Sequence, residues 1–558
     1  MEISPVSRPA AMAAACFALL FGGRLAAEEP ALELPKYAVT TGRELPPPET
    51  WYYTRIAGQE VLSSASRRRT EDIARDIAQL LHALDLTGTG LLPKPKVPLR
   101  IFIAGRPDQF LALAPRVLES GETDPESATF GGTESPILVI NAAARSLDSE
   151  AAAPDEATGT ADARTSTMRA TDAIRRLQTG YFRTVLAQQR PALPPWFIEG
   201  VAQVLAWARV TENSVTLGFV EDPNQTGPVG GIDRQPGRRA FSDVHHEFIP
   251  GRDSLAYDLD FNAALSHSAL FPMPELFAAD LHTFPGKENY AKLLRWQKQC
   301  HAFVHWGLFG DYGKNKKQFL AFMKRLQAEP LTEQLFKESF RMGYAEALTT
   351  LRNHIDMTRV TFVGVKADKG QKLPPAPPIE VREATPFEVA HLKSIAYTAG
   401  GQPGMAREEL ILAYRRGERD PNLLADLGLA ELAGGDEERA RKFLEAAFTG
   451  KAVGPRAHVE LARLRFAEAQ AAPAAAGGRL DAAQVARVLE PLKLAHSQPP
   501  PLPETYRLLG AACQAGELPP SPAQRQLLDE GSRLFPRDAE LEKLRAALPP
   551  LPPAPAKG

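Results

Sequence analysis

The 558-residue chain has few cysteines and almost no net charge. Cys16, Cys300 and Cys513 are far apart and no Cys-x-x-Cys pair occurs, so neither a disulfide framework nor a zinc ribbon is indicated. Lys and Arg number 65 against 67 Asp and Glu, a formal charge of −2. A dedicated nucleic-acid binder usually carries a basic excess, so no nucleic-acid partner is expected. No apolar run after the N-terminus approaches about 18 residues, so no transmembrane span is expected in the mature chain.

Several catalytic sequence motifs are missing as well. The chain has no Gly-x-Ser-x-Gly, no Gly-x-x-x-x-Gly-Lys-Ser/Thr, no Gly-x-Gly-x-x-Gly and no His-Glu-x-x-His. Their absence removes the usual sequence signals of serine hydrolases, P-loop proteins, dinucleotide-binding proteins and zinc peptidases. What is present is an ordinary globular composition, 44% hydrophobic and 24% charged, over a length that predicts two or three domains.

The N-terminus has the three-part pattern of a secretory signal. Arg8 precedes an apolar run, and small residues then lead to Ala27. Residues 1–27 are therefore predicted to be a signal peptide cleaved after Ala27, which places the protein in the periplasm or outside the cell. A lipoprotein signal that uses Cys16 is the alternative, although the apolar run continues past this cysteine. The proline-bearing residues 28–50 are predicted to be extended.

The spacing of apolar residues predicts a mixed α+β domain over residues 51–366. Strands are expected at 51–56, 59–62, 97–103, 137–140 and 360–365. Helices are expected at 66–86, 168–189, 196–208, 288–309, 314–328, 331–340 and 344–355. Residues 367–385 are rich in proline and are predicted to form a linker.

Residues 386–547 repeat with a period near 34. Four prolines punctuate the segment, with a low-complexity insert before the last of them: Pro386, Pro421, Pro455 and Pro503. Two pairs of small residues keep the same register: Ala406 with Ala440, and Ala413 with Ala447. With the Leu-Gly steps at 427–428 and 509–510, the pattern resembles tetratricopeptide repeats. The resemblance implies an all-α stack of helix pairs that binds a protein or peptide partner. Residues 548–558 are expected to be a proline-rich tail.

A second resemblance lies in residues 194–203, which read Pro-Pro-Trp-Phe-Ile-Glu-Gly-Val-Ala-Gln. The Trp-x-x-Glu-Gly-x-Ala pattern resembles the helix that supplies the glutamate zinc ligand of gluzincin, or peptidase MA-like, metallopeptidases. Weaker likeness extends over roughly residues 51–357. The resemblance implies a zincin-like fold and makes Glu199 the counterpart of that ligand. In those enzymes an earlier helix carries His-Glu-x-x-His, which provides two zinc ligands and a general base.

The corresponding helix of this chain has lost that motif. The alignment puts Thr179 and Arg183 at the two histidine positions and Gly180 at the catalytic glutamate. Threonine is a poor zinc ligand, arginine is an obligate cation, and glycine offers no base. We therefore expect no catalytic residues and no cofactor, and hypothesise that Arg183 pairs with Glu199 in place of the metal. The plainer interpretation of Glu199 is a carboxylate favoured by the start of its helix.

Three functional hypotheses follow. The first is an exported, non-catalytic binding or scaffold protein, with a zincin-like α+β domain followed by a tetratricopeptide-like repeat domain. The second is a noncanonical zinc metallopeptidase or other hydrolase of the cell envelope. Its candidate ligands are His301 and His305, which are four residues apart on a predicted helix and therefore share a face. The third is a structural envelope protein that acts through its repeats alone.

Overall fold

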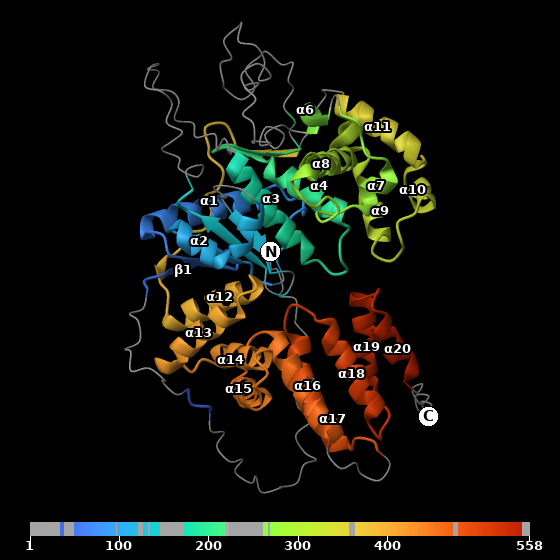
Figure 1. Cartoon of the computed structure of the whole chain (residues 1–558). Coiled ribbons are helices and arrows are strands. Elements are labelled where there is room, and N and C mark those ends of the chain that lie inside the picture. The colour runs from blue at the N-terminus through green and yellow to red at the C-terminus, as the bar shows by residue number, and fades with distance from the viewer. Residues whose placement is uncertain are drawn as a thin grey trace, which may run out of the picture.

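The computed structural model describes residues 34–37, 49–95, 97–120, 127–131, 134, 136–144, 172–218, 220, 261–265, 268–356, 363–471 and 478–548. The predicted signal peptide and residues 549–558 of the predicted tail lie outside these ranges. An α+β region comes first in the chain and is followed by a region made of helices (Figure 1). The coarse prediction of an α+β fold with a helical C-terminal region is therefore confirmed.

A six-stranded mixed sheet forms the centre of the first region. Its strands, in spatial order, are β4 (Ser127–Phe130), β5 (Ile137–Asn141), β3 (Arg100–Ala104), β2 (Gln59–Ser63), β1 (Tyr52–Ile56) and β9 (Arg382–Glu383). β2, β3 and β5 are parallel, whereas β4, β1 and β9 run antiparallel to their neighbours. The parallel strands are almost entirely buried. β3 and β5 have the nearly continuous apolar sequences that burial on both faces favours, whereas β2 also buries Gln59 and Ser63. β4 is left at one edge of the sheet.

Helices cover both faces of this sheet. The helices of the first region are α1 (Arg67–Leu86), α2 (Pro107–Leu113), α3 (Asp172–Ala187), α4 (Pro195–Ala206), α6 (Phe261–Leu265), α7 (Met273–Ala278), α8 (Tyr290–Gly313), α9 (Lys316–Arg325), α10 (Glu333–Phe340) and α11 (Tyr344–Asp356). Alternate strand residues enter different cores because successive side chains point to opposite faces. Ile101 and Ile103 pack with α3, α4 and α8, whereas Phe102 packs with α2.

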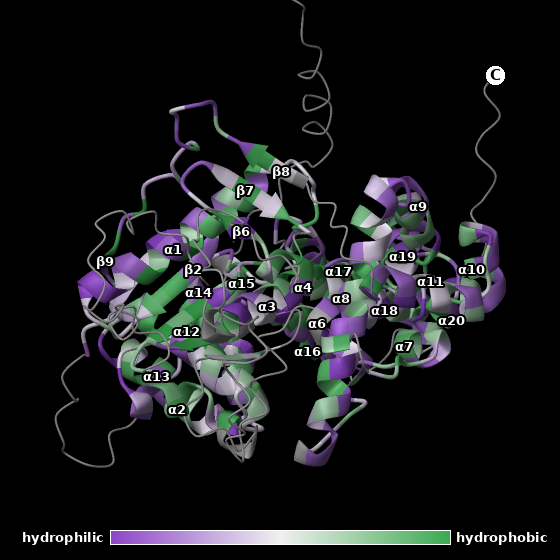
Figure 2. Ribbon diagram, turned by 90° about the horizontal axis from the view of Figure 1, so that it is seen from above, coloured by the Kyte–Doolittle hydropathy of each residue, from purple (hydrophilic) through white to green (hydrophobic). Residues whose placement is uncertain are grey.

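The short second sheet contains β6 (Arg209–Val210), β7 (Ser214–Leu217) and β8 (Val363–Lys366), joined in antiparallel order. Figure 2 shows β7 and β8 side by side at one edge of the molecule. The strand expected at 360–365 is therefore present as β8, whose described residues begin at 363.

Close approach of two helices depends on Gly200. A Cβ atom at this position of α4 would lie 2.3 Å from Val304 Cγ2 and 2.5 Å from the backbone oxygen of Cys300, both on α8. Only glycine lets the two helices pack at this separation. The Glu-Gly step in the 194–203 segment thus has a packing reason that is independent of any catalytic role.

The second region consists of helices that pack in consecutive pairs. They are α12 (Pro386–Ala399), α13 (Pro403–Arg415), α14 (Pro421–Ala433), α15 (Glu437–Thr449), α16 (Pro455–Ala471), α17 (Ala482–Ser497), α18 (Pro503–Ala515), α19 (Pro522–Leu534) and α20 (Ala539–Ala547). Each of the four periodic prolines is the first residue of a helix, where its missing N–H costs nothing. The four alanines in register are all buried, on α13 and α15. The period near 34 therefore corresponds to one helix pair.

The two regions share a core. Residues 367–385, predicted as a linker, contribute β9, which pairs with β1. Beyond it, Leu392 and Ala396 of α12 pack with Trp51 and Phe102 of the sheet region. The first helix of the repeats is thus part of the covering of the sheet, on the same face as α2 (Figure 1).

Candidate functional site

Arg183 and Glu199 form a bidentate ion pair between α3 and α4. Arg183 Nε donates to Glu199 Oε2 at 2.5 Å and Arg183 Nη2 donates to Oε1 at 2.8 Å. Gln203, one turn further along α4, donates to Oε1 at 2.9 Å. The Glu199 side chain is 1% exposed and that of Arg183 is 21% exposed. The pairing hypothesised from the sequence is therefore present, and both carboxylate oxygens of Glu199 accept hydrogen bonds.

The other two predicted positions lie beside this pair on α3. Thr179 is buried, and its hydroxyl donates to the backbone oxygen of Arg175 at 2.8 Å, so its hydrogen bond stays within its own helix. Gly180 faces the edge strand β4, because a Cβ atom there would lie 3.1 Å from Thr129 Cγ2. Any side chain at this position would need the Thr129 side chain to shift by a few tenths of an ångström.

These residues do not fit a zinc ion. Zinc in proteins takes imidazole, thiolate and carboxylate ligands. Among the four positions only Glu199 is such a ligand, and the guanidinium of Arg183 already neutralises it. A dication placed there would meet a permanent positive charge at contact distance. The geometry instead supports a structural role, in which a buried ion pair joins α3 to α4.

His301 and His305, the alternative metal ligands, both lie on α8 and are buried. The two ring nitrogens of His305 contact His354 Nε2 at 2.9 Å and the backbone oxygen of Gly218 at 2.7 Å. The Phe261 ring packs against both imidazoles, with centroid distances of 4.9 and 5.0 Å. His305 is thus held on both nitrogens by the protein itself, and sequence reasoning missed its partner His354, which lies on α11.

This histidine pair predicts acid sensitivity. Burial lowers the pKa of His305 to about 4 and that of His354 to about 3, whereas an unfolded histidine titrates near pH 6.5. The unfolded state therefore binds more protons than the folded state below pH 6.5. The free energy of unfolding is highest above pH 6.5 and decreases as the pH falls below this value. We expect urea titrations to show a loss of up to about 1.4 kcal/mol per pH unit for each histidine between about pH 6.5 and pH 4.

His354→Gln is expected to reduce this pH dependence only in part, because it removes one buried histidine with a lowered pKa, while burial also lowers the pKa of His301 and of His458. The exposed His282 provides the control. If His282→Gln and His354→Gln change the pH slope equally, the buried pair is not its source.

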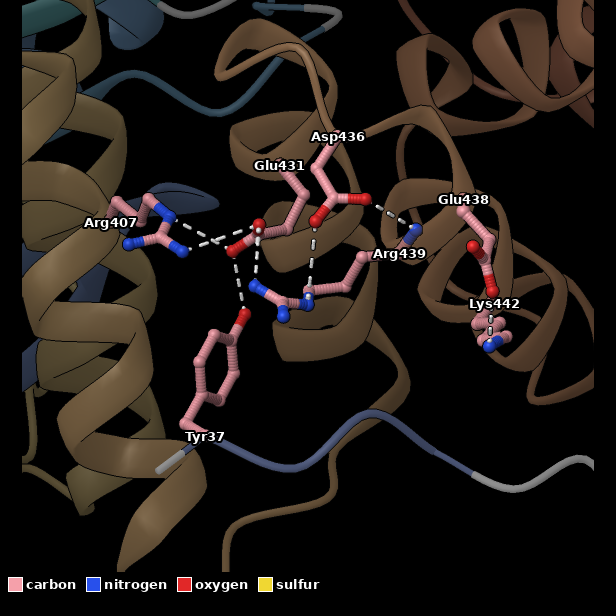
Figure 3. Close-up of polar contacts among 7 residues, drawn as sticks. All are labelled: Tyr37, Arg407, Glu431, Asp436, Glu438, Arg439 and Lys442. Atoms are coloured by element: carbon pink, nitrogen blue, oxygen red, sulfur yellow. Dashed lines mark hydrogen bonds and ion pairs between the residues drawn. The ribbon is translucent and has the colours of Figure 1, made fainter. Parts of the chain in front are cut away.

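A further site that sequence reasoning missed lies on the helical region, where Tyr37 docks (Figure 3). Its hydroxyl donates to Glu431 Oε1 at 2.7 Å, and burial together with this bond raises the pKa of Tyr37. Glu431 is 2% exposed and also accepts from Arg407 Nε at 2.9 Å. Arg439 Nη1 lies 3.5 Å from the same carboxylate. The available sequence signal was that Tyr37 is the one aromatic residue in the lead over 28–50.

Comparison of this chain with known proteins assigns no function to the residues described above. Among the helices that the structure describes, none is both long and apolar enough to cross a bilayer. In the same parts of the chain, no three His, Cys, Asp or Glu side chains gather in a way that would hold a metal ion. No family model, curated protein or solved structure matches this chain.

Proposed function

We propose that this chain is an exported, non-catalytic binding protein, in which a zincin-like domain without a working metal site carries tetratricopeptide-like repeats that bind a protein or peptide. The observation that carries the proposal is the bidentate pair of Arg183 with the buried Glu199. At the place where the family resemblance expects a zinc ion and a general base, the chain has a guanidinium and a glycine. The arrangement joins α3 to α4 through a carboxylate that the Arg183 guanidinium neutralises.

The second region supports the binding half of the proposal. Its helix pairs stack with the period of a tetratricopeptide array, and such arrays use their surfaces to hold extended segments. A segment of this chain already lies on them, since Tyr37 docks between Arg407 and Arg439. The export half rests on the N-terminal signal pattern.

Restoring the lost zinc ligands tests this proposal. We expect the protein comprising residues 28–558 to retain less than about a tenth of an equivalent of zinc after dialysis, measured by plasma mass spectrometry. The double variant Thr179→His with Arg183→His adds two imidazoles one turn apart, opposite Glu199. Because the family resemblance puts the two histidine ligands at these positions, we expect this variant to retain close to one equivalent.

The matched control is Thr179→Asn with Arg183→Gln, which changes the same positions without adding metal ligands and is expected to retain no more zinc than the wild type. Near-stoichiometric zinc in the wild-type protein would overturn the proposal. Equal zinc in the two double variants would show that α3 and α4 do not have the geometry of a zincin site.

A further inference from the structure

We propose that the surface around Glu431 is a peptide-binding site for an extended segment that contains an unmodified tyrosine, and that residues 34–37 occupy it as an internal competitor. We call this surface the tyrosine site and define it by five residues of α13, α14 and α15: Arg407, Tyr414, Glu431, Arg439 and Phe443. The inference deepens the proposed function, because it names the surface and the ligand chemistry of the repeat region.

The tyrosine ring is recognised on several sides. It lies parallel to Phe443, with centroids 6.2 Å apart and planes 13° apart, and meets Tyr414 edge to face at 5.8 Å. The guanidinium carbons of Arg407 and Arg439 lie 5.7 and 5.3 Å from the ring centroid. Such stacking and cation–π contacts are specific to an aromatic side chain.

The hydroxyl of the ligand tyrosine is recognised as a donor. It donates to Glu431, a buried carboxylate that the two arginines neutralise. A phenylalanine would leave that oxygen without this donor. A phosphotyrosine would place a dianion with no proton to donate against the same carboxylate. The site therefore selects tyrosine over both, because a hydrogen bond to a charged acceptor is lost in the first case and replaced by repulsion in the second.

The backbone of the segment is also held. Tyr414 donates its hydroxyl hydrogen to the backbone oxygen of Pro35 at 3.0 Å. Leu34 packs against the same apolar cluster as Tyr37, whereas Lys36 is exposed. The recognised pattern is thus an apolar residue, a proline and, two positions after the proline, a tyrosine. The proline restricts the segment to an extended backbone and lowers the entropy lost on docking.

The tyrosine site is built without the segment that fills it. Arg407 comes from α13, Glu431 from α14, and Arg439 and Phe443 from α15. These helices pack on one another through a core of their own, and the arginines bind Glu431 directly. Residues 34–37 form no helix or strand and pair with no strand. If residues 34–37 dissociate, the helices and ion pairs that form the site remain in place. A site that binds a segment of another chain needs this property.

Tethering makes the internal segment a strong competitor. A short tether gives an effective concentration on the order of 1 mM. If the intrinsic Kd of the segment and of a free peptide is on the order of 10–100 μM, the tethered segment fills the site almost completely. The apparent affinity of the free peptide is then about 10–100-fold weaker. Tyr37→Ala removes the anchor and frees the site.

Fluorescence anisotropy tests the proposal with a labelled peptide of residues 32–39, Leu-Glu-Leu-Pro-Lys-Tyr-Ala-Val. We expect the Tyr37→Ala protein, over residues 28–558, to bind it about 10–100-fold more tightly than the wild type does. Tyr312→Ala, which alters a tyrosine that is 71% exposed in the first region, should behave as the wild type. Thermal melting followed by circular dichroism confirms that each variant is folded.

Peptide and protein changes test the chemistry of the site separately. Against the Tyr37→Ala protein, we expect peptides with phenylalanine, phosphotyrosine or alanine at the tyrosine position to bind at least about tenfold more weakly. Adding Tyr414→Phe to that protein removes only the hydroxyl that bonds Pro35, and should weaken the tyrosine peptide by about fivefold.

Equal affinity of the wild type and the Tyr37→Ala protein for the tyrosine peptide would overturn the internal competition. A phosphotyrosine or alanine peptide that binds as well as the tyrosine peptide would overturn the proposed recognition. Neither result touches the zinc measurement, so the non-catalytic assignment of the first region stands or falls separately.

Discussion

Arg183→Met is expected to lower the free energy of unfolding by about 3–5 kcal/mol. Glu199 is 1% exposed, and both of its carboxylate oxygens accept from Arg183. Removing the guanidinium leaves a buried carboxylate that, among the residues described in the structure, keeps Gln203 as its donor. An uncompensated buried charge costs far more than the pair contributes, because the desolvation of the carboxylate is no longer offset. Urea unfolding followed by circular dichroism measures the loss.

Two companion variants separate the charge from the packing. The double substitution Arg183→Met with Glu199→Leu removes both charges, and we expect it to recover most of the stability that the single substitution loses. Arg67→Met breaks an exposed pair, whose partners are 63% and 38% exposed, and should change stability by less than about 1 kcal/mol. If Arg183→Met costs no more than Arg67→Met, the ion pair does not hold α3 to α4.

Gly200→Ala is expected to destabilise the protein by about 2–4 kcal/mol. The added methyl group would lie 2.5 Å from the backbone oxygen of Cys300 and 2.3 Å from Val304 Cγ2. A different Val304 rotamer does not relieve the clash, because Val304 Cβ would itself lie 2.8 Å from the added methyl group, and the backbone of α8 can yield only if the whole helix moves. Thermal melting and urea unfolding both report the change.

Gly404→Ala is the matched control, because this glycine also lies in a helix, α13, and has nothing within 4 Å of its Cβ position. Alanine favours the helix more than glycine does, so we expect a change of no more than about 1 kcal/mol in the stabilising direction. Equal effects of the two substitutions would contradict the close packing of α4 on α8.

Local chemistry made one part of the candidate site predictable from sequence. The pairing of Arg183 with Glu199 was hypothesised because the family resemblance puts Arg183 at a metal-ligand position opposite Glu199, and because two opposite charges need each other once buried. The role of Gly200 was not predictable in the same way, because its neighbour Val304 comes from a helix about a hundred residues later in the chain. Only the packed structure shows which backbone lies against it.

The sequence by itself determined the order of the regions, the positions of the central strands and the repeat period, since each of these is recorded in the spacing of residues along one segment. Tertiary structure alone decided three other features. His305 contacts His354, α12 covers the sheet although it begins the repeats, and Tyr37 reaches Glu431 across 394 positions. Each of these contacts joins two segments whose own sequence patterns predict their secondary structure but not the segment that they contact. Which segments meet is determined only when the chain folds and buries both surfaces together.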